Sequence, residues 1–291
     1  MRVIKQIICK TFAAGAFLAA ILYVVSSIQA QSVSSADQGV SGSSPSATPT
    51  PTPAPKPKTT WGGVYFGGFG GSNFSGASAN TSTVFDPNGY FAPSSVPAVN
   101  TTGTQSLKGN NITGGIEIGY NRQRDKFVYG AEIDLGILSG TKTATGTTVY
   151  PCCGPTTFTV SQSLKSSWLV TLRPRAGFAI GDKILVYATG GGALTKYDYE
   201  AVFTDTHNAA TESGSINKKR FGWIGGGGVE YMIRKRISVK GEFLHTEFGR
   251  VSTTSTNLNI NIPPGNVTVN PFAHSVFIKG NLVRFGINFH F

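Results

Sequence analysis

The sequence predicts an all-β fold, an eight-stranded antiparallel up-and-down transmembrane β-barrel, and three observations predict it. Residues 277–291 alternate strictly between apolar and polar side chains and end on Phe291, as in a strand whose two faces meet different environments. Gly, Thr, Ser, Asn and aromatic residues dominate the composition, with 37 Gly among 291 residues, and only 13% of residues are charged, which favours strands over helices. The connections between strands alternate between short and long, a pattern typical of outer-membrane barrels.

The N-terminal part of the chain is predicted to lie outside the barrel. Residues 1–30 read as a secretory signal peptide, with a basic start, an apolar run over 11–25 and a small residue, Ala30, at its end. Residues 31–60 are rich in Ser, Pro and Thr, and we expect a disordered periplasmic segment. After Ala30 no apolar run is long enough for a membrane helix, so the barrel is assigned to residues 61–291.

Eight segments with strand-like patterns follow in order. They are Gly62–Phe74, Asn111–Asn121, Phe127–Leu138, Leu164–Ile180, Ile184–Tyr197, Lys219–Ile233, Ile237–Phe248 and Val276–Phe291. Tight turns are expected near Asp125, Asp182 and Arg234–Arg236, and long loops are expected over Ser75–Asn110, Ser139–Ser163, Asp198–Lys218 and Gly249–Ser275. The tight turns are predicted to be periplasmic and the long loops extracellular.

The two faces of these segments differ in chemistry. Outward positions carry Ile, Leu, Val, Phe, Tyr and Trp, with aromatic residues toward the segment ends. Inward positions hold nearly all charges of the strands: Glu117, Glu132, Asp134, Arg173, Arg175, Glu230, Lys240, Glu242 and Arg284. Five acids and four bases facing one lumen predict an internal ion-pair network, because a buried charge is costly unless it is paired. An eight-stranded barrel is narrow enough for side chains to fill, so the lumen is expected to be plugged.

Counting residues from the tight turns gives an expected register. Glu132 and Asp134 lie about as far from that end as Arg175 and Arg173 do. Across the turn at Arg234–Arg236, Glu230 faces Lys240. Glu242 falls near the level of Arg284. A catalytic or proton-path role for these carboxylates is the less favoured interpretation.

Several motifs together resemble a known family. The segments W-G-G-V-Y-F-G-G at Trp61, G-G-I-E-I-G-Y-N at Gly114, V-Y-G-A-E-I-D-L at Val128 and K-G-E-F-L-H-T-E-F-G at Lys240, with the terminal V-R-F-G-I-N-F-H-F, resemble porin-family small outer-membrane β-barrels of alphaproteobacteria. That group includes major surface antigens and some hemin-binding proteins. The resemblance implies an eight-stranded barrel in the cell outer membrane. It also implies insertion by the outer-membrane assembly machinery, which reads the last strand with Ile287, Phe289 and Phe291.

The cysteines and histidines give little support for a metal site, a cofactor or catalysis. Cys152 and Cys153 are adjacent in a long loop, and export favours either a disulfide between them or cross-links to other chains. No metal site is expected, because no further ligand pattern accompanies them. His207 and His274 fall in long loops, where hemin is a weakly supported ligand. No Ser-His-acid spacing points to catalysis, so no enzyme and no firm cofactor are expected.

Basic residues gather at both rims of the predicted barrel. Those near the long loops suit lipopolysaccharide phosphates, whereas no basic strip with interleaved aromatics indicates nucleic-acid binding. We therefore expect a structural, surface-exposed barrel that contacts outer-membrane lipid and a host or environmental surface. A hemin or ligand receptor and a narrow pore are the alternatives.

Overall fold

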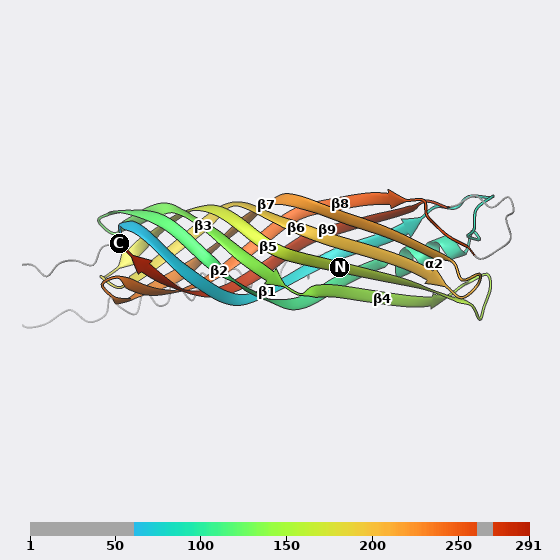
Figure 1. Ribbon diagram of the computed structural model, residues 1–291, viewed down its shortest axis with the longest axis horizontal. Coiled ribbons are helices and arrows are strands. Elements are labelled where there is room, and N and C mark those ends of the chain that lie inside the picture. The colour runs from blue at the N-terminus through green and yellow to red at the C-terminus, as the bar shows by residue number, and fades with distance from the viewer. Residues whose placement is uncertain (1–60, 261–269) are drawn as a thin grey trace, which may run out of the picture. The chain divides into compact units, whose positions relative to one another are not determined.

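The computed structural model describes residues 61–260 and 270–291, which form one long antiparallel sheet rolled into a barrel (Figure 1). The elements in chain order are β1 (Gly63–Thr83), α2 (Ser95–Thr102), β2 (Thr104–Arg124), β3 (Phe127–Ser139), β4 (Thr141–Val149), β5 (Thr157–Ile180), β6 (Ile184–Asp205), β7 (Thr211–Arg234), β8 (Ile237–Ser255) and β9 (Phe272–His290). The predicted signal peptide (1–30) and the Ser/Pro/Thr-rich segment (31–60) lie outside the described residues.

The sheet closes on itself. Neighbouring strands pair in the order β3-β2-β1-β9-β8-β7-β6-β5-β4, and β3 also pairs with β5. β3 and β4 occupy successive lengths of one barrel wall, because both pair with β5 and only Gly140 separates them. Gly140 has φ +132°, a conformation that favours glycine. The nine described strands therefore occupy eight positions around the barrel, because β3 and β4 share one of them. The predicted eight-stranded antiparallel barrel is confirmed.

An apolar belt encircles one half of the barrel. Alternate residues point outward there and are exposed, among them Phe66, Ile116, Leu135, Leu172 and Phe285. The belt runs from the tight turns to about the level of Gly140, where Thr141, Thr143, Thr145 and Thr147 become the outward residues of β4. We call the two ends of the barrel the turn end and the loop end. Phe291 lies at the turn end, and α2 lies at the loop end (Figure 1).

The strands continue well beyond the belt, which corrects the predicted loop lengths. β1 reaches Thr83 and β2 begins at Thr104, so most of the expected loop Ser75–Asn110 is strand and helix. The expected loops Ser139–Ser163, Asp198–Lys218 and Gly249–Ser275 likewise contain long stretches of strand. The connecting segments at the loop end are therefore shorter than expected. Beyond the belt the outward residues are mainly polar, which removes the apolar alternation but not the sheet hydrogen bonds.

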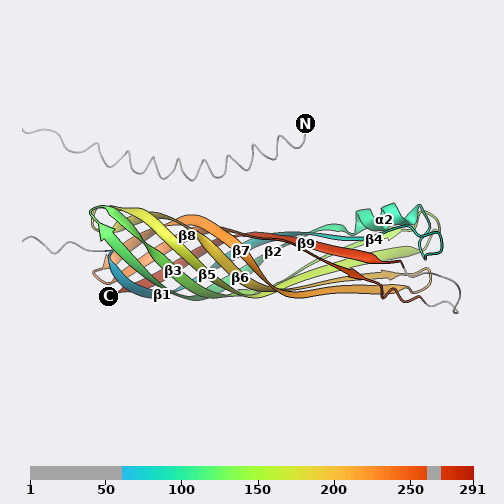
Figure 2. The same ribbon diagram turned by 90° about the horizontal axis from the view of Figure 1, so that it is seen from above.

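Side chains fill the barrel in successive layers. An apolar cluster with Trp61, Val128, Leu185 and Met232 closes the turn end. Above it lie the charged residues, then a second apolar cluster with Leu138, Leu169, Ile224 and Leu282. A third cluster at the loop end packs Phe91, Val99, Phe158, Phe203 and Phe272 together. Figure 2 shows α2 beside β4, where it covers this end of the barrel, and Thr102 and Thr148 hydroxyls meet there at 2.8 Å.

The helical content of the described residues is small. None of their helices is long and apolar enough to cross a membrane.

Candidate functional site

The nine charged residues predicted to face the lumen meet in one layer of the barrel. They come from β2, β3, β5, β7, β8 and β9, and none is more than 4% exposed. Each sits at an inward position of its strand, because side chains alternate between the two faces. We call this set the ion-pair layer: Glu117, Glu132, Asp134, Arg173, Arg175, Glu230, Lys240, Glu242 and Arg284.

Two arginines hold three carboxylates in the middle of the layer. Arg173 forms ion pairs with Glu132, with Asp134 at 3.0 Å and with Glu242 at 3.4 Å. Arg284 approaches Glu242 at 2.9 Å and Asp134 at 3.3 Å. The pairs therefore cross the lumen between β3, β5, β8 and β9. Charge-assisted hydrogen bonds of this kind are stronger than neutral ones.

Arg175 lies nearer the turn end and is framed by two tyrosines. Its guanidinium contacts Glu230 at 2.8 Å and Glu132 at 3.4 Å. The same group lies 3.9 Å from the ring centre of Tyr187 and donates a hydrogen bond to the Tyr65 hydroxyl at 2.8 Å. The sequence pattern did not single out Tyr65 or Tyr187, although both occupy inward positions at the level of the charges.

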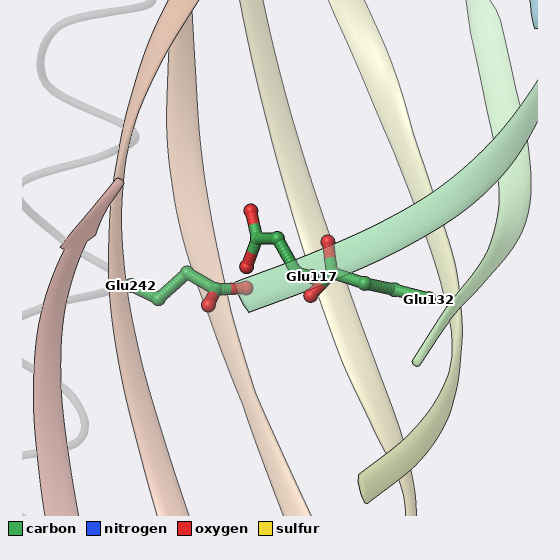
Figure 3. Close-up of side chains that lie close together, drawn as sticks. All are labelled: Glu117, Glu132 and Glu242. Carbon is green, nitrogen blue, oxygen red and sulfur yellow. The ribbon is translucent and has the colours of Figure 1, made fainter. Parts of the chain in front are cut away.

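Lys240 occupies the centre of a carboxylate cluster. Figure 3 shows Glu117, Glu132 and Glu242 extending from separate strands toward one another, and their oxygen atoms have a spacing that a metal ion would accept. The Lys240 ammonium lies 2.7 Å from Glu117, 3.0 Å from Glu132 and 3.5 Å from Glu242. The Lys240 ammonium group therefore already occupies the position that a metal ion would take among these carboxylates.

The structure corrects the predicted register between β3 and β5 and confirms it between β7 and β8 and between β8 and β9. Glu132 lies directly opposite Arg173, not Arg175, because tilted barrel strands are staggered and counting from the turns ignores that stagger. Glu230 and Lys240 are direct partners across the turn, but their side chains part: Glu230 binds Arg175 while Lys240 binds the carboxylate cluster. Glu242 and Arg284 are direct partners, as expected from their level.

A second polar centre lies at the loop end, on Asp205. Its carboxylate accepts hydrogen bonds from the Tyr90 hydroxyl at 2.6 Å and the Tyr150 hydroxyl at 2.8 Å. The backbone N–H groups of His207, Asn208 and Ala210 donate to its other oxygen. Burial, followed by the hydrogen bond to Asp205, raises the pKa of both tyrosines above the ordinary value. Asp205 thus ties three loop-end segments together.

The two histidines named as hemin candidates have different surroundings. His207 lines a small loop-end pocket of about 70 Å³ with Tyr90, Phe91 and Tyr150. His274 is completely buried inside the barrel. Its Nδ1 meets the Thr81 hydroxyl at 3.0 Å, and its Nε2 lies 3.0 Å from both Ser255 and Glu212.

The Ser255–His274–Glu212 cluster is not arranged as a catalytic triad. In a triad the acid and the nucleophile contact opposite ring nitrogens, whereas here both contact the same nitrogen. The pattern of sequence spacings gave no sign of this cluster, because its members come from β7, β8 and β9. It connects polar groups within the extended part of the barrel.

Cys152 and Cys153 form a disulfide at the loop end. Ser95 Oγ, at the start of α2, lies 3.4 Å from Cys152 Sγ. Both cysteines line the same small pocket as His207. The disulfide therefore belongs to the contact between the 150–156 connection and α2.

The three terminal residues predicted to guide assembly, Ile287, Phe289 and Phe291, all point outward and are exposed at the turn end. Phe66 on β1 stacks on Phe289 and Phe291 with ring centres 5.5 and 5.7 Å apart. Since β1 pairs with β9, this aromatic group lies at the seam where the barrel closes.

Both a family profile and individual proteins of the outer membrane match this sequence. The sequence profile of the outer membrane protein beta-barrel domain matches residues 20–269. The 31 kDa outer-membrane immunogenic protein of Brucella melitensis is 28% identical over 191 residues, covering 65% of this chain and 70% of that protein. A protein of the same name from Brucella suis matches equally.

Among solved structures, the outer membrane protein OprG from Pseudomonas aeruginosa matches with TM-score 0.42 and 14% identity. That match covers 79% of this chain and 97% of OprG. Neisserial surface protein A matches with TM-score 0.33 and 10% identity, covering 78% of this chain and 97% of that protein.

Proposed function

The chain belongs to the outer membrane protein β-barrel family, and on that premise we propose that it is a non-conducting structural barrel that presents a surface for contact with the environment or a host. The matched family is one of membrane barrels rather than of enzymes. The tight turns face the periplasm and the loop end faces outward, as in barrels with short turns and longer loops on opposite rims.

The observation that carries this proposal is the ion-pair layer. Arg173, Arg175, Lys240 and Arg284 neutralise carboxylates from opposite walls, so the pairs cross the whole lumen. Apolar clusters lie on both sides of this layer. An ion passing through would have to separate desolvated ion pairs and then cross two apolar layers, each at high free-energy cost.

Surface contact is assigned to the part of the barrel beyond the apolar belt. There α2, the disulfide and the Asp205 centre hold the loop-end segments in a fixed arrangement. The rim where the belt ends carries exposed lysines, including Lys165 and Lys219. These cations fit a contact with lipopolysaccharide phosphates in the outer leaflet.

Planar-bilayer conductance of the purified full-length protein tests the proposal. We expect no steady conductance above that of the empty bilayer. The Arg173→Ala/Glu242→Ala variant, which opens the centre of the layer, should give noisy, short-lived current. The matched variant Glu247→Ala/Arg250→Ala removes one charge of each sign outside the lumen and should remain silent. Stable unitary current steps from wild-type monomers would overturn the plugged lumen and favour the narrow pore.

Hemin binding is the second candidate function, and it rests on His207. This residue lines a pocket with three aromatic side chains at the loop end, whereas His274 is buried and engaged by three hydroxyl or carboxylate groups. Hemin titration followed by its Soret band tests the candidate. A loss of binding in His207→Ala, with His245→Ala as the control, supports it, and unchanged binding in both removes His207 as the ligand.

We also assign the terminal aromatic group a role in assembly. Ile287, Phe289 and Phe291 form the outward end of the last strand, where the assembly machinery would read them. Replacing Phe291 by Ser should lower the amount of folded protein in the outer membrane without changing the amount synthesised. Equal insertion of both proteins would contradict this role.

A further inference from the structure

β7 and β8 separate part of the way along the barrel wall. Their pairing begins at Trp223 and Glu247 and runs from there toward the turn end, while β7 stays paired with β6 along its whole length. Beyond Trp223 the two strands are joined by side chains: Arg220 donates to the carbonyl oxygens of Phe248 at 3.4 Å and of Arg250 at 3.2 Å. We call this place the β7–β8 fork.

An open groove of about 520 Å³ lies on the outer surface at the fork. Its floor contains Gly192, Gly222 and Gly249, and its aromatic walls are Phe221 and Trp223, both at least half exposed. A side chain at position 222 would meet the Glu247 carbonyl oxygen at 2.3 Å, so the groove depends on glycine there. The groove is mainly apolar and opens on the outer surface, which suits contact with an acyl chain.

Lys196 and Lys219 lie at outward positions on the loop-end side of this groove, and Lys218 and Arg220 flank Lys219 along β7. We call these four residues the basic patch. Lys196 and Lys219 are direct cross-strand partners on the outward face, although like charges in that position repel. The next outward pair toward the turn end is Leu194 and Phe221. The positive charges therefore sit immediately beside the apolar groove, at the edge of the belt.

Nearby acids compensate only part of this charge. Lys196 reaches Asp198 at 3.6 Å, but both side chains are about one-third exposed, so this contact is weak. Glu200 lies further toward the loop end on the same strand, and Glu247 lines the groove and is the direct partner of both Trp223 and Lys279. Among the ion pairs of the described residues, none involves Lys218, Lys219 or Arg220.

A second outward groove shows why the cations matter. It lies within the belt between Phe285, Ile287, Val229 and Tyr231, and its lining is apolar or glycine except for Lys240, which is buried and belongs to the ion-pair layer. That groove suits any lipid tail. The groove at the fork combines an apolar channel with a cluster of cations, which is the chemistry of a phosphorylated lipid.

We propose that the basic patch and the groove at the β7–β8 fork form a specific site for lipopolysaccharide, with a lipid A phosphate on Lys196 and Lys219 and one acyl chain against Phe221 and Trp223. This proposal rests on the rim contact put forward under Proposed function and narrows it to one face of the barrel. A phosphate placed between Lys196 and Lys219 also removes their mutual repulsion, because charge-assisted contacts replace it.

Native mass spectrometry of the full-length protein in detergent, titrated with lipid A, tests the site. The test variant is Lys196→Gln/Lys219→Gln. The matched control is Lys108→Gln/Lys279→Gln, which removes two exposed lysines from the β2 and β9 side of the same rim. Heat-modifiability on a gel first establishes that both variants are folded. We expect the apparent Kd for lipid A to rise about tenfold or more in the test variant and less than about twofold in the control.

Two further arms identify the ligand. Dephosphorylated lipid A lacks the group that contacts Lys196 and Lys219 and should bind the wild type about tenfold more weakly than lipid A. Phosphatidylglycerol carries one phosphate where lipid A carries two and should also bind more weakly than lipid A. Phe221→Ala should weaken lipid A binding while leaving the headgroup contacts intact. Equal loss in the test and control variants overturns the local site but leaves the general rim contact standing. Absence of lipid A binding to the wild type overturns both, and equal binding of phosphatidylglycerol overturns the assignment to lipopolysaccharide.

Discussion

Glu242 of β8 and Arg284 of β9 are direct partners in the sheet, and their side chains meet inside the barrel at 2.9 Å. Arg284 also reaches Asp134 on the opposite wall at 3.3 Å, and its guanidinium lies 4.2 Å from the ring centre of Phe69. One cross-strand pair thus anchors the terminal strand to the centre of the barrel. Because β9 also pairs with β1, the strand that closes the barrel also carries Arg284, one of the side chains that fill the lumen.

Removing both partners of this pair should cost less than the sum of the two single removals, because each single removal leaves a buried charge without its partner. Arg284→Ala leaves Glu242 and Asp134 without one of their cations in a desolvated layer, and we expect the free energy of unfolding to fall by about 3–5 kcal/mol. The double variant Glu242→Ala/Arg284→Ala should be less destabilised than the sum of the single variants, with a coupling energy of about 1–3 kcal/mol. Urea unfolding in lipid vesicles, followed by Trp fluorescence, measures all three.

The control for this cycle is Arg250→Ala. Arg250 is exposed, and within the described part of the chain its side chain hydrogen-bonds only to Ser275, at 3.3 Å. Its loss should therefore change the unfolding free energy by less than about 0.5 kcal/mol. Additive effects of Glu242→Ala and Arg284→Ala would mean that the two groups do not interact in the folded barrel.

Asp205 should hold the loop-end segments in place without affecting the stability of the barrel as a whole. Asp205→Ala leaves the Tyr90 and Tyr150 hydroxyls and three backbone N–H groups without their acceptor, at a local cost of about 2–4 kcal/mol. We expect faster proteolysis of the segments 84–103 and 150–156 and an unchanged heat-modifiability midpoint. Asp86→Ala, which removes an exposed turn contact, is the control. Equal protection of these segments in the Asp205 variant would disprove the anchoring role.

Lys142 should give the protein a distinctive pH dependence. It lies just beyond the apolar belt, is buried, and donates to the Ser75 carbonyl oxygen at 3.0 Å. Burial lowers the pKa of its ammonium group from 10.5 to about 8. Between these two values the unfolded chain binds more protons than the folded chain, so this group makes stability rise with pH from about 8 to 10.5 and adds no slope below 8.

The substitution Lys142→Met removes a cation that is costly to bury. We expect the free energy of unfolding at pH 7 to increase by about 2 kcal/mol. The increase of this free energy with pH between about 8 and 10 should become shallower. Lys165→Met changes an exposed lysine on the paired strand and should do neither. An identical pH profile for wild type and Lys142→Met would show that Lys142 does not titrate in this window.

The disulfide should matter locally rather than globally. The entropy that a disulfide removes from the unfolded chain grows with the number of residues in the loop that it closes. A link between adjacent residues therefore restricts the unfolded chain very little. Cys152→Ser/Cys153→Ser should therefore shift the unfolding free energy by less than about 1 kcal/mol. Hydrogen exchange should become faster in the 150–156 connection and in the first turn of α2, where Ser95 contacts Cys152. A large loss of global stability would contradict this.

Alternation within the apolar belt is sufficient to predict the barrel. Ile116 and Phe285 point outward while Glu117 and Arg284 point inward, and this follows from the two-residue period of a strand. The same period identifies all members of the ion-pair layer, because a charge at an inward position of a narrow barrel has to be paired.

The strands beyond the belt are harder to predict, because their outward residues face water. On β4 the outward Thr143, Thr145 and Thr147 replace the apolar residues that mark a strand in the membrane. The inward positions of β4 hold Lys142, Ala144, Gly146 and Thr148, so the contrast between its two faces is weak. A run of Thr, Ser and Asn then reads equally well as a loop.

The partners within each layer depend on stagger, which sequence patterns do not reveal. Arg175 reaches Glu230 across the barrel at 2.8 Å in addition to Glu132, the residue at its counted level, at 3.4 Å. Tyr65 and Tyr187 complete its surroundings through long-range contacts. The Asp205 centre and the His274 cluster were missed for the same reason: each gathers residues from separate elements with no characteristic spacing.

Cysteine accessibility at position 288 tests the sealed lumen most directly. Asn288 is fully buried, with its amide donating to Glu230 at 3.0 Å. Asn288→Cys is introduced into mature protein that carries Cys152→Ser and Cys153→Ser, reconstituted in liposomes and exposed to a small, charged, membrane-impermeant thiol reagent. Ser252→Cys, at an exposed position on β8, is the control. The sealed lumen predicts reaction at position 288 at least about a hundredfold slower than at 252. Comparable rates at the two positions would show that water fills the barrel and would contradict the ion-pair plug.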